Sequence, residues 1–258
     1  MSIDFTGVNA VTIPEGSVSK ITRKSDGLIL WEKISVPAAP TLEEASWEFI
    51  SEASKTGLAS TYWAIGDQKN ITVNGVTYAV DIIGFDHDTP TSTSDYGRSK
   101  AGITFQLHDL LATTYKMNNS NTNSGGWKSS VMRTSTMTTL LSRLASDLKA
   151  VIVPVDKVSG TGGGSSSGTE TVSDSLFLLA DIEVFGSANY SVSGEGTQYA
   201  YYKNGGSKIK KKSGSPVGWW LRSPHSGNSN RFCDVTPGGG AYYNFAGASF
   251  GLSFGFCV

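Results

Sequence analysis

The sequence predicts an α+β fold in which two helices lie beside a loop-rich antiparallel sheet, preceded by a small β module. Three observations lead to this class. Two segments carry apolar residues at helical spacing, and several short apolar runs are separated by turn residues. The 30 glycines, together with many Ser, Thr and Asn, indicate frequent turns. At 258 residues the chain is long enough to bury a substantial core.

The N-terminal residues 1–36 are expected to form the small β module. Val8–Ile13 and Val18–Ile21 have the composition of short strands, and the stretch KSDGLILWEK predicts a turn followed by another strand. Residues 37–41, which contain Pro-Ala-Ala-Pro, predict a stiff linker. A module this small buries little surface by itself, so it suits an attachment device.

The main domain is expected to span residues 42–258 and to begin with a helix. Thr41 would cap this helix, acidic residues in its first turn suit the helix dipole, and Gly57 would end it. Trp47, Ile50 and Ser54 would then share one face. The following stretch ITVNGVTYAVDIIGF predicts two strands joined by an Asn-Gly turn.

The middle of the chain predicts a second helix and further strands. Ser135–Lys149 carries an apolar stripe of leucines. Val151–Val155 is typical of a buried strand, and residues 159–174, which are rich in Gly and Ser, predict a mobile loop inside the domain. The stretch SLFLLADIEVFG then returns to strand character. The leucines of the stripe are Leu140, Leu141, Leu144 and Leu148.

Charge and hydropathy exclude several classes of protein. A net charge of −1 gives no strong attraction to nucleic acid or to an anionic membrane. The one basic run, Lys208 with Lys210–Lys212, reads as a solvated loop. No apolar stretch is long enough for a membrane helix, so no membrane insertion is expected, and the N-terminus lacks a secretory signal pattern. We therefore expect synthesis in the cytosol, with any outside location reached by assembly or lysis.

Two groups of residues are candidate chemical sites. Asp86-His87-Asp88 could join His108-Asp109 in a metal site, but the alternation along a strand end favours a surface loop. Cys233 and Cys257 lack zinc-ligand spacing, so they predict either buried thiols on neighbouring strands or a disulfide formed after release. No P-loop or nucleophile-elbow motif occurs. The sequence therefore predicts no metal and no cofactor.

The C-terminal segment, residues 222–258, has an unusual composition. It is rich in Gly, Ser, Asn and aromatic residues, and it contains no Lys, Glu, Gln, Trp or Met. A strand region of low charge could have this composition. So could a region that has been diversified by mutation of adenines, because an Asn codon mutated at its first two bases yields many residue types but none of these five.

The second explanation arises from a resemblance. The stretches EVFGSANYSVSGEGTQYAYYKNGG, GWWLRSP, RFCDV and GLSFGFCV resemble a domain of phage and prophage proteins. That domain is grouped with the C-type-lectin-like variable proteins of diversity-generating retroelements, whose template adenines are randomised during reverse transcription. The resemblance covers residues 42–258. The N-terminal module is similar, more weakly, to segments of phage structural proteins.

The resemblance implies a C-type-lectin-like fold with fixed scaffold positions and variable positions between them. The motif departs from the family at Pro237-Gly238-Gly239, where an Asp-Gly turn is more usual. The scaffold positions are Trp219, Trp220, Leu221, Phe232, Val235, Phe254 and Phe256. The variable, ligand-binding positions are His225, Asn228, Asn230, Arg231, Asp234, Thr236, Pro237, Tyr242, Tyr243, Asn244, Gly247, Ser249 and Phe250.

The function expected from the resemblance is non-enzymatic binding of a bacterial surface protein or glycan by a virion or phage-tail protein. The N-terminal module would attach the chain to a tail or virion component. The calcium-binding motifs of sugar-binding lectins are absent, although sugar stacking on Tyr242 or Tyr243 stays open. One alternative is a fixed structural or decoration protein. A second is an oxidase similar to formylglycine-generating enzymes, which would use Cys233 and Cys257.

Overall fold

The computed structural model describes residues 20–22, 29–32, 40–164 and 168–258, with side chains in the last two ranges. The chain divides into two compact units, Met1–Ala39 and Pro40–Val258. The boundary between the units falls inside the predicted linker at residues 37–41.

The N-terminal unit contains one antiparallel strand pair. Strand β1 (Lys20–Thr22) pairs with β2 (Ile29–Glu32), and the register slips by one residue at Ile21/Thr22. Strand β2 confirms the strand predicted after the turn in KSDGLILWEK. The predicted strand Val18–Ile21 overlaps β1, while the predicted strand Val8–Ile13 lies outside the described residues.

The helices of the second unit are short. Among its described residues only α1 is longer than one or two turns, and no helix is long and apolar enough to span a membrane. The helices are α1 (Trp47–Thr56), α2 (Ala59–Tyr62), α3 (Thr93–Tyr96), α4 (Gly126–Ser129), the π-helix η1 (Met132–Met137), α5 (Thr138–Ser142), α6 (Ser146–Val151), α7 (Asp181–Phe185) and α8 (Ala200–Lys203).

The strands form several small antiparallel sheets. A four-stranded sheet has the order β13–β5–β4–β3, a three-stranded sheet has the order β10–β11–β12, and β6–β7 and β8–β9 are separate hairpins. The α+β class is therefore confirmed, but the prediction of only two helices is wrong. The strands are β3 (Gln68–Val73), β4 (Val76–Phe85), β5 (Ile103–Leu107), β6 (Val155–Gly160), β7 (Thr169–Asp174), β8 (Lys211–Lys212), β9 (Ser215–Pro216), β10 (Trp219–Pro224), β11 (Arg231–Val235), β12 (Ala241–Phe245) and β13 (Gly255–Cys257).

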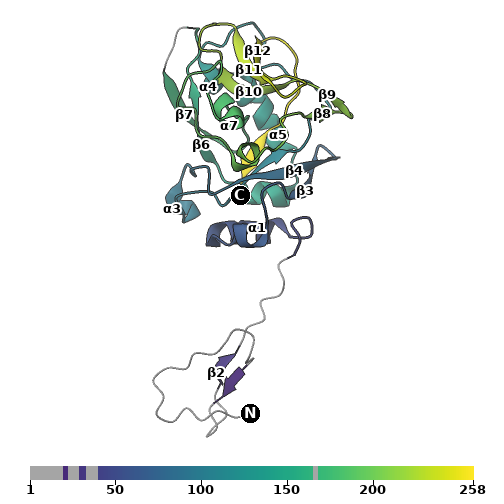
Figure 1. Ribbon diagram of the computed structural model, residues 1–258, viewed down its shortest axis with the longest axis vertical. Coiled ribbons are helices and arrows are strands. Elements are labelled where there is room, and N and C mark those ends of the chain that lie inside the picture. The colour runs from purple at the N-terminus through teal and green to yellow at the C-terminus, as the bar shows by residue number, and fades with distance from the viewer. Residues whose placement is uncertain (1–19, 23–28, 33–39, 165–167) are drawn as a thin grey trace. The chain divides into compact units, whose positions relative to one another are not determined.

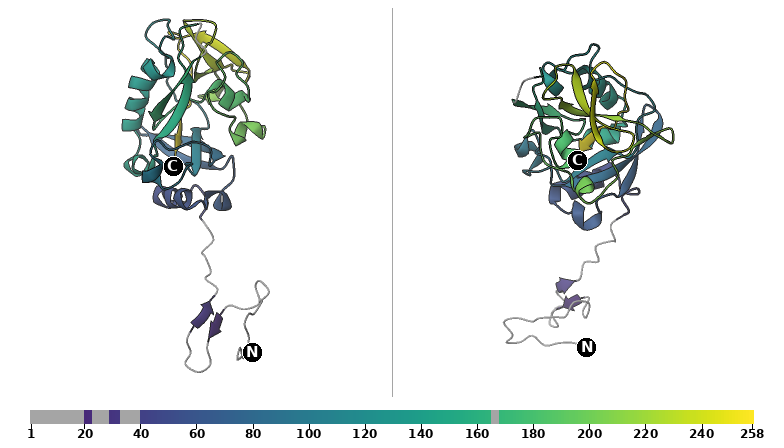
Figure 2. Two further views of the ribbon diagram at one scale, coloured as in Figure 1. Left: turned by 90° about the vertical axis from the view of Figure 1, so that its left-hand side faces the viewer. Right: turned by 45° about the horizontal axis from the view of Figure 1, so that its top comes forward.

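The two larger sheets occupy different parts of the second unit. The β10–β11–β12 sheet lies at one end, and α1 with the β3–β4 hairpin lies at the other (Figure 1). The two further views show the same separation (Figure 2). The C-terminal strand β13 runs through the interior beside β5, and Val258 is fully buried. The core therefore continues from one sheet to the other, and the β10–β11–β12 sheet packs against it.

Helix α1 begins later than predicted. Its N-cap is Ser46, whose hydroxyl accepts a hydrogen bond from the Phe49 amide at 3.1 Å. Thr41 instead closes a turn upstream, where its hydroxyl donates to Glu44 at 2.7 Å. Gly57 ends the helix with φ at 76°, as predicted. The predicted inner face is buried: Trp47, Ile50 and Ser54.

The Asn-Gly hairpin is confirmed, and it explains why the second predicted helix is interrupted. Asn74 and Gly75 both have positive φ, at 51° and 78°, as a tight hairpin turn requires. The Asn74 amide donates to the Arg143 carbonyl at 3.1 Å, and Val73 forms a bridge with Leu144. The hairpin thereby takes up backbone groups at the end of α5, so the prediction of one helix over 135–149 is wrong. Three of the four predicted leucines are buried and one is partly buried: Leu140, Leu144, Leu148 and Leu141.

Three other segments differ from their predictions. Val151 ends α6 and only Val155 begins a strand, so 151–155 is not one strand. The predicted loop at 159–174 is largely a hairpin, because β6 and β7 pair from Val155↔Asp174 to Gly160↔Thr169. The stretch SLFLLADIEVFG is buried chain with one bridge, Phe177↔Gly255, followed by α7. Local composition did not reveal these long-range pairings.

The basic run is only partly a solvated loop. Lys211 is exposed, but Lys210 is 3% exposed and its ammonium donates to the carbonyl oxygens of Leu107 and His108. It also lies 5.6 Å from the centre of the Trp219 ring. Burial lowers the pKa of Lys210 to about 8. The solvated-loop prediction is therefore wrong for this residue.

Candidate functional site

Five of the seven predicted scaffold positions lie on β10 and β11, and the other two, Phe254 and Phe256, lie just before and on β13 of the four-stranded sheet. All of them are fully buried, and the two tryptophans also satisfy their ring N–H groups. The Trp219 ring N–H donates to the Lys208 carbonyl at 3.0 Å, and that of Trp220 donates to the Tyr115 carbonyl at 2.8 Å. The sheet is therefore rigidly seated on the core. The seven buried positions are Trp219, Trp220, Leu221, Phe232, Val235, Phe254 and Phe256.

Most predicted variable positions reach the surface of this sheet and its loops. The exposed ones are Pro237, Tyr242 and Ser249. The half-buried ones are His225, Asn228, Asn230, Arg231, Thr236, Tyr243, Asn244, Gly247 and Phe250. Two of these positions are constrained: the Phe250 ring packs 4.9 Å from that of Trp220, and a side chain at Gly247 would meet Asn121 at 2.7 Å. Such positions tolerate change only if their neighbours move.

Asp234 does not lie on the surface, which corrects its assignment as a ligand contact. Its side chain is 1% exposed and accepts a hydrogen bond from the Asn244 amide at 2.7 Å. Burial raises the pKa of Asp234 to about 6, although the hydrogen bond from Asn244 opposes the shift. Asp234 therefore holds the Asn244 amide through this hydrogen bond.

Tyr243 is the centre of an aromatic cluster on the edge strand β12. Its ring lies parallel to that of Tyr242, with centroids 4.8 Å apart and planes 6° apart. Tyr190 and His225 meet it edge-on at 4.8 and 4.4 Å. Phe245, on the same strand, is 43% exposed. We call Tyr190, His225, Tyr242, Tyr243 and Phe245 the aromatic platform.

Arg231 lies beside this platform. Its guanidinium carbon is 5.0 Å from the centre of the Tyr243 ring and 4.7 Å from that of Phe245. Burial lowers the pKa of His225, and the positive charge of Arg231 lowers it further. His225 is therefore neutral at pH 7, and Arg231 is the cation of the platform.

A shallow polar groove adjoins the start of β11. It is lined by Asn228, Ser229 and Asn230 and by the glycine backbone at 163, 164 and 227. Fully buried Asn123 holds the loop before β11 in place, because its amide donates to the carbonyls of Asn228 and Arg231 at 2.7 and 2.8 Å. Sequence reasoning missed Asn123, which lies about a hundred positions earlier in the chain.

Beneath the sheet lies a buried chain of charges that the sequence did not predict. The Lys157 ammonium donates to Asp88 at 2.7 Å and to Glu183 at 2.8 Å. The Arg222 guanidinium donates to Glu183 at 2.8 Å. All four side chains are at most 5% exposed. The acidic and basic groups alternate, so each buried charge has a partner of opposite sign.

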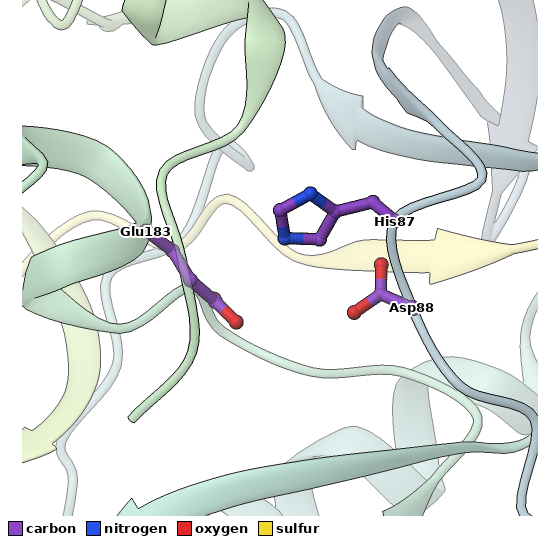
Figure 3. Close-up of side chains that lie close together, drawn as sticks. All are labelled: His87, Asp88 and Glu183. Atoms are coloured by element: carbon purple, nitrogen blue, oxygen red, sulfur yellow. The ribbon is translucent and has the colours of Figure 1, made fainter. Parts of the chain in front are cut away.

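Asp88 is part of this network, so the interpretation of Asp86-His87-Asp88 as a surface loop is wrong for Asp88. His87 and Asp88 face Glu183 across the site (Figure 3), and one ligand atom from each lies within 4.8 Å of the others. The Lys157 ammonium already supplies the positive charge between the two carboxylates. Burial alone would raise the pKa of Asp88, but Lys157 and His87 hold it well below its usual range.

The other half of the predicted metal cluster lies in different contacts. The His108 ring contacts Asp81 at 2.9 Å and the Gln68 amide at 2.9 Å. Asp109 accepts a hydrogen bond from the Lys211 backbone at 2.7 Å. The structure therefore does not bring these residues together with His87 and Asp88.

Both cysteines are free and buried. They lie on β11 and β13, which belong to different sheets, so the prediction that they lie on neighbouring strands is wrong. Burial raises the pKa of both thiols well above the usual value. Thr104 contacts the Cys257 sulfur at 3.4 Å. Both side chains behave as small core residues.

Residues 101–253 match the model of a family described as Domain of unknown function (DUF6273), and the chain belongs to that family. The matched region includes the whole β10–β11–β12 sheet and the loops around the aromatic platform. No curated protein and no solved structure matches the chain.

Proposed function

We propose that this chain is a non-enzymatic ligand-binding protein whose binding face is the aromatic platform and its surrounding loops. The observation that carries the proposal is the contrast within one sheet. Strand β10 and all of β11 after Arg231 are buried, whereas β12 presents exposed or half-buried Tyr, Asn and Phe side chains, with half-buried Arg231 opposite Phe245. Tyr and Phe offer rigid contact area, and Asn, Ser and Gly offer adaptable hydrogen bonding, as in antibody binding loops.

The proposal includes the origin of this face. Residues 222–258 are diversified by a retroelement, and the domain has the C-type-lectin-like fold of such variable proteins. The absence of Lys, Glu, Gln, Trp and Met from this segment supports this origin. The α+β class with small antiparallel sheets is compatible with that fold.

The ligand in this proposal is a bacterial surface molecule, and the protein is part of a phage tail or virion. Attachment is through the N-terminal unit, which contains the β1–β2 pair. Several copies displayed together would raise weak single-site binding by avidity. Fixed decoration of a tail or virion is the alternative.

The oxidase alternative is less favourable on chemical grounds. A catalytic cysteine reacts as the thiolate and needs an accessible sulfur with a lowered pKa. Cys233 and Cys257 are about 1% exposed or less, and burial raises the pKa of both. Replacement of both by Ser would abolish turnover in an oxidase but would leave ligand binding intact in the proposed protein.

The proposal is tested by measuring how fluorescently labelled full-length chain binds a panel of bacterial strains. Tyr242→Ala should reduce binding to the recognised strain, because this ring is 47% exposed on the platform. Val76→Ala is the matched control, since Val76 is 50% exposed at the start of β4 in the other sheet, next to the Asn-Gly turn. Equal binding by Tyr242→Ala and Val76→Ala would contradict the proposed face.

A further inference from the structure

Arg231 is an arginine whose charge is not neutralised within the described part of the chain. No carboxylate among residues 40–164 and 168–258 lies within ion-pair distance of its guanidinium, in contrast to Arg98, Arg133 and Arg222. Its Nε is buried and receives no hydrogen-bond acceptor from these residues. A buried donor normally has an acceptor, because leaving it unpaired destabilises the fold. Because this Nε is closed to solvent, a ligand would instead reach the terminal nitrogens of the guanidinium, for which the described residues supply no acceptor.

The position of Arg231 is fixed before any ligand arrives. Its guanidinium lies over the rings of Tyr243 and Phe245, and Phe245 is directly opposite it in the β11–β12 ladder. A guanidinium held against aromatic rings loses little further freedom when it binds, and its planar fork matches a carboxylate. Asp234, three positions along β11, is buried and accepts a hydrogen bond from the Asn244 amide, and among the described residues it forms no ion pair with Arg231.

The charge of the site is small. His225, which contacts the Tyr243 ring, is neutral at pH 7 because burial and Arg231 lower its pKa. A single cation matches a ligand with one negative charge per recognised unit. It fits a carboxylate better than a dense phosphate cluster, which several arginines or lysines would bind.

The surroundings of Arg231 suit a hydroxyl-rich ligand. Tyr242 and Phe245 expose 47% and 43% of their surface, and a flat ring of this kind offers an apolar face to a pyranose. The adjoining groove is lined by Asn228, Ser229 and Asn230 with glycine backbone, and no aliphatic side chain lines it. It therefore offers hydrogen bonds to hydroxyl groups but no apolar pocket to anchor a peptide side chain.

We propose that the platform binds an acidic saccharide, with the sugar carboxylate on the Arg231 guanidinium and the sugar ring on the exposed aromatic surface. This inference rests on the proposed function and names its ligand class. The polar groove takes hydroxyl groups of the same or a neighbouring sugar. Neutral glycans lack the group that Arg231 recognises and bind more weakly.

The test uses the full-length chain and immobilised polygalacturonate, alginate, hyaluronan and polysialate, each beside its carboxyl-reduced form, in biolayer interferometry. We expect at least one acidic polymer to bind about ten- to a hundredfold more tightly than its reduced form, as a charge-assisted hydrogen-bond pair contributes. Arg231→Gln should remove this preference. Lys203→Gln, which removes the same charge from an exposed residue of α8, should retain it.

Thermal unfolding of each variant separates loss of recognition from loss of folding. Arg231→Lys keeps the charge but not the planar fork, so it should retain part of the preference. The inference is overturned if no acidic polymer is preferred over its reduced form, or if folded Arg231→Gln keeps the preference. If carboxyl-reduced polymers bind as tightly as the acidic ones and this binding requires Tyr242, the acidic-saccharide inference is wrong but the proposed binding face stands. Strain binding that is insensitive to Tyr242→Ala would overturn the proposed function itself.

Discussion

Replacement of Lys157 by Met tests the buried charge network most sharply. Lys157 is 2% exposed and is the ion-pair partner of Asp88 at 2.7 Å among the described residues. Methionine preserves most of the volume but leaves Asp88 without a cation, while Glu183 keeps Arg222. Removing one partner of a buried pair costs about 3–5 kcal/mol. For a domain of this size the melting temperature should fall by roughly 6–20 °C.

The cost of Lys157→Met should depend on pH in a defined direction. In the wild-type chain the pKa values of Asp88 and Glu183 are lowered, so their contribution to stability is present above about pH 4 and is lost as the pH falls. Without Lys157, burial raises the pKa of Asp88 and the folded chain takes up a proton. The difference between wild type and variant should therefore be largest at pH 7 and shrink toward pH 4.

Calorimetric melting at pH 4, 5.5 and 7 measures this difference. Lys128→Met is the matched control, because Lys128 is 57% exposed and pairs with Glu170 at 3.1 Å on the surface. The control should cost less than about 1 kcal/mol. A Lys157→Met loss as small as that of the control, or one that does not change with pH, would refute the reasoning.

Three further predictions follow from the candidate site. Trp220→Ala should destabilise the domain by about 3–5 kcal/mol in denaturant unfolding, whereas Tyr242→Ala should change stability by less than about 0.5 kcal/mol, and equal losses would contradict the division into scaffold and face. Because the pKa of Asp234 is raised, the folded chain binds this proton more tightly than the unfolded chain, and stability falls as the pH rises from about 4 to 6. Asp234→Asn should therefore raise the melting temperature at pH 7.5 but not at pH 4. Asn123→Ala removes the donor to carbonyls of the loop before β11, so it should lower the melting temperature and increase amide hydrogen exchange in residues 225–231. Unchanged exchange in these residues would refute the anchoring role of Asn123.

The sequence predicted those features that depend on local chemistry. The Asn-Gly turn specified the β3–β4 hairpin because both residues accept positive φ, and Gly57 ended α1 for the same reason. The bulky scaffold residues were correctly placed in the core, because Trp219, Trp220 and Phe232 have apolar bulk that water disfavours.

The features that the sequence did not predict depend on pairings between distant residues. Lys157 and Asp88 are 69 positions apart, and nothing local distinguishes them from surface charges. The Arg143 carbonyl at the end of α5 accepts a hydrogen bond from the Asn74 amide, which belongs to the β3–β4 hairpin much earlier in the chain. Asp234 is expected at a surface by composition, but it is buried and accepts a hydrogen bond from Asn244 on the neighbouring strand. Tertiary contacts of this kind override local propensity.

The most direct test of the diversified binding face is deep sequencing of this gene in a population that carries it. We predict substitutions at adenine-templated codons within residues 222–258, concentrated at exposed positions such as Tyr242, Ser249 and Pro237, while buried Trp220, Phe232 and Phe254 stay fixed. Uniformly low variation across the segment, or substitutions spread equally over buried and exposed positions, would contradict the account.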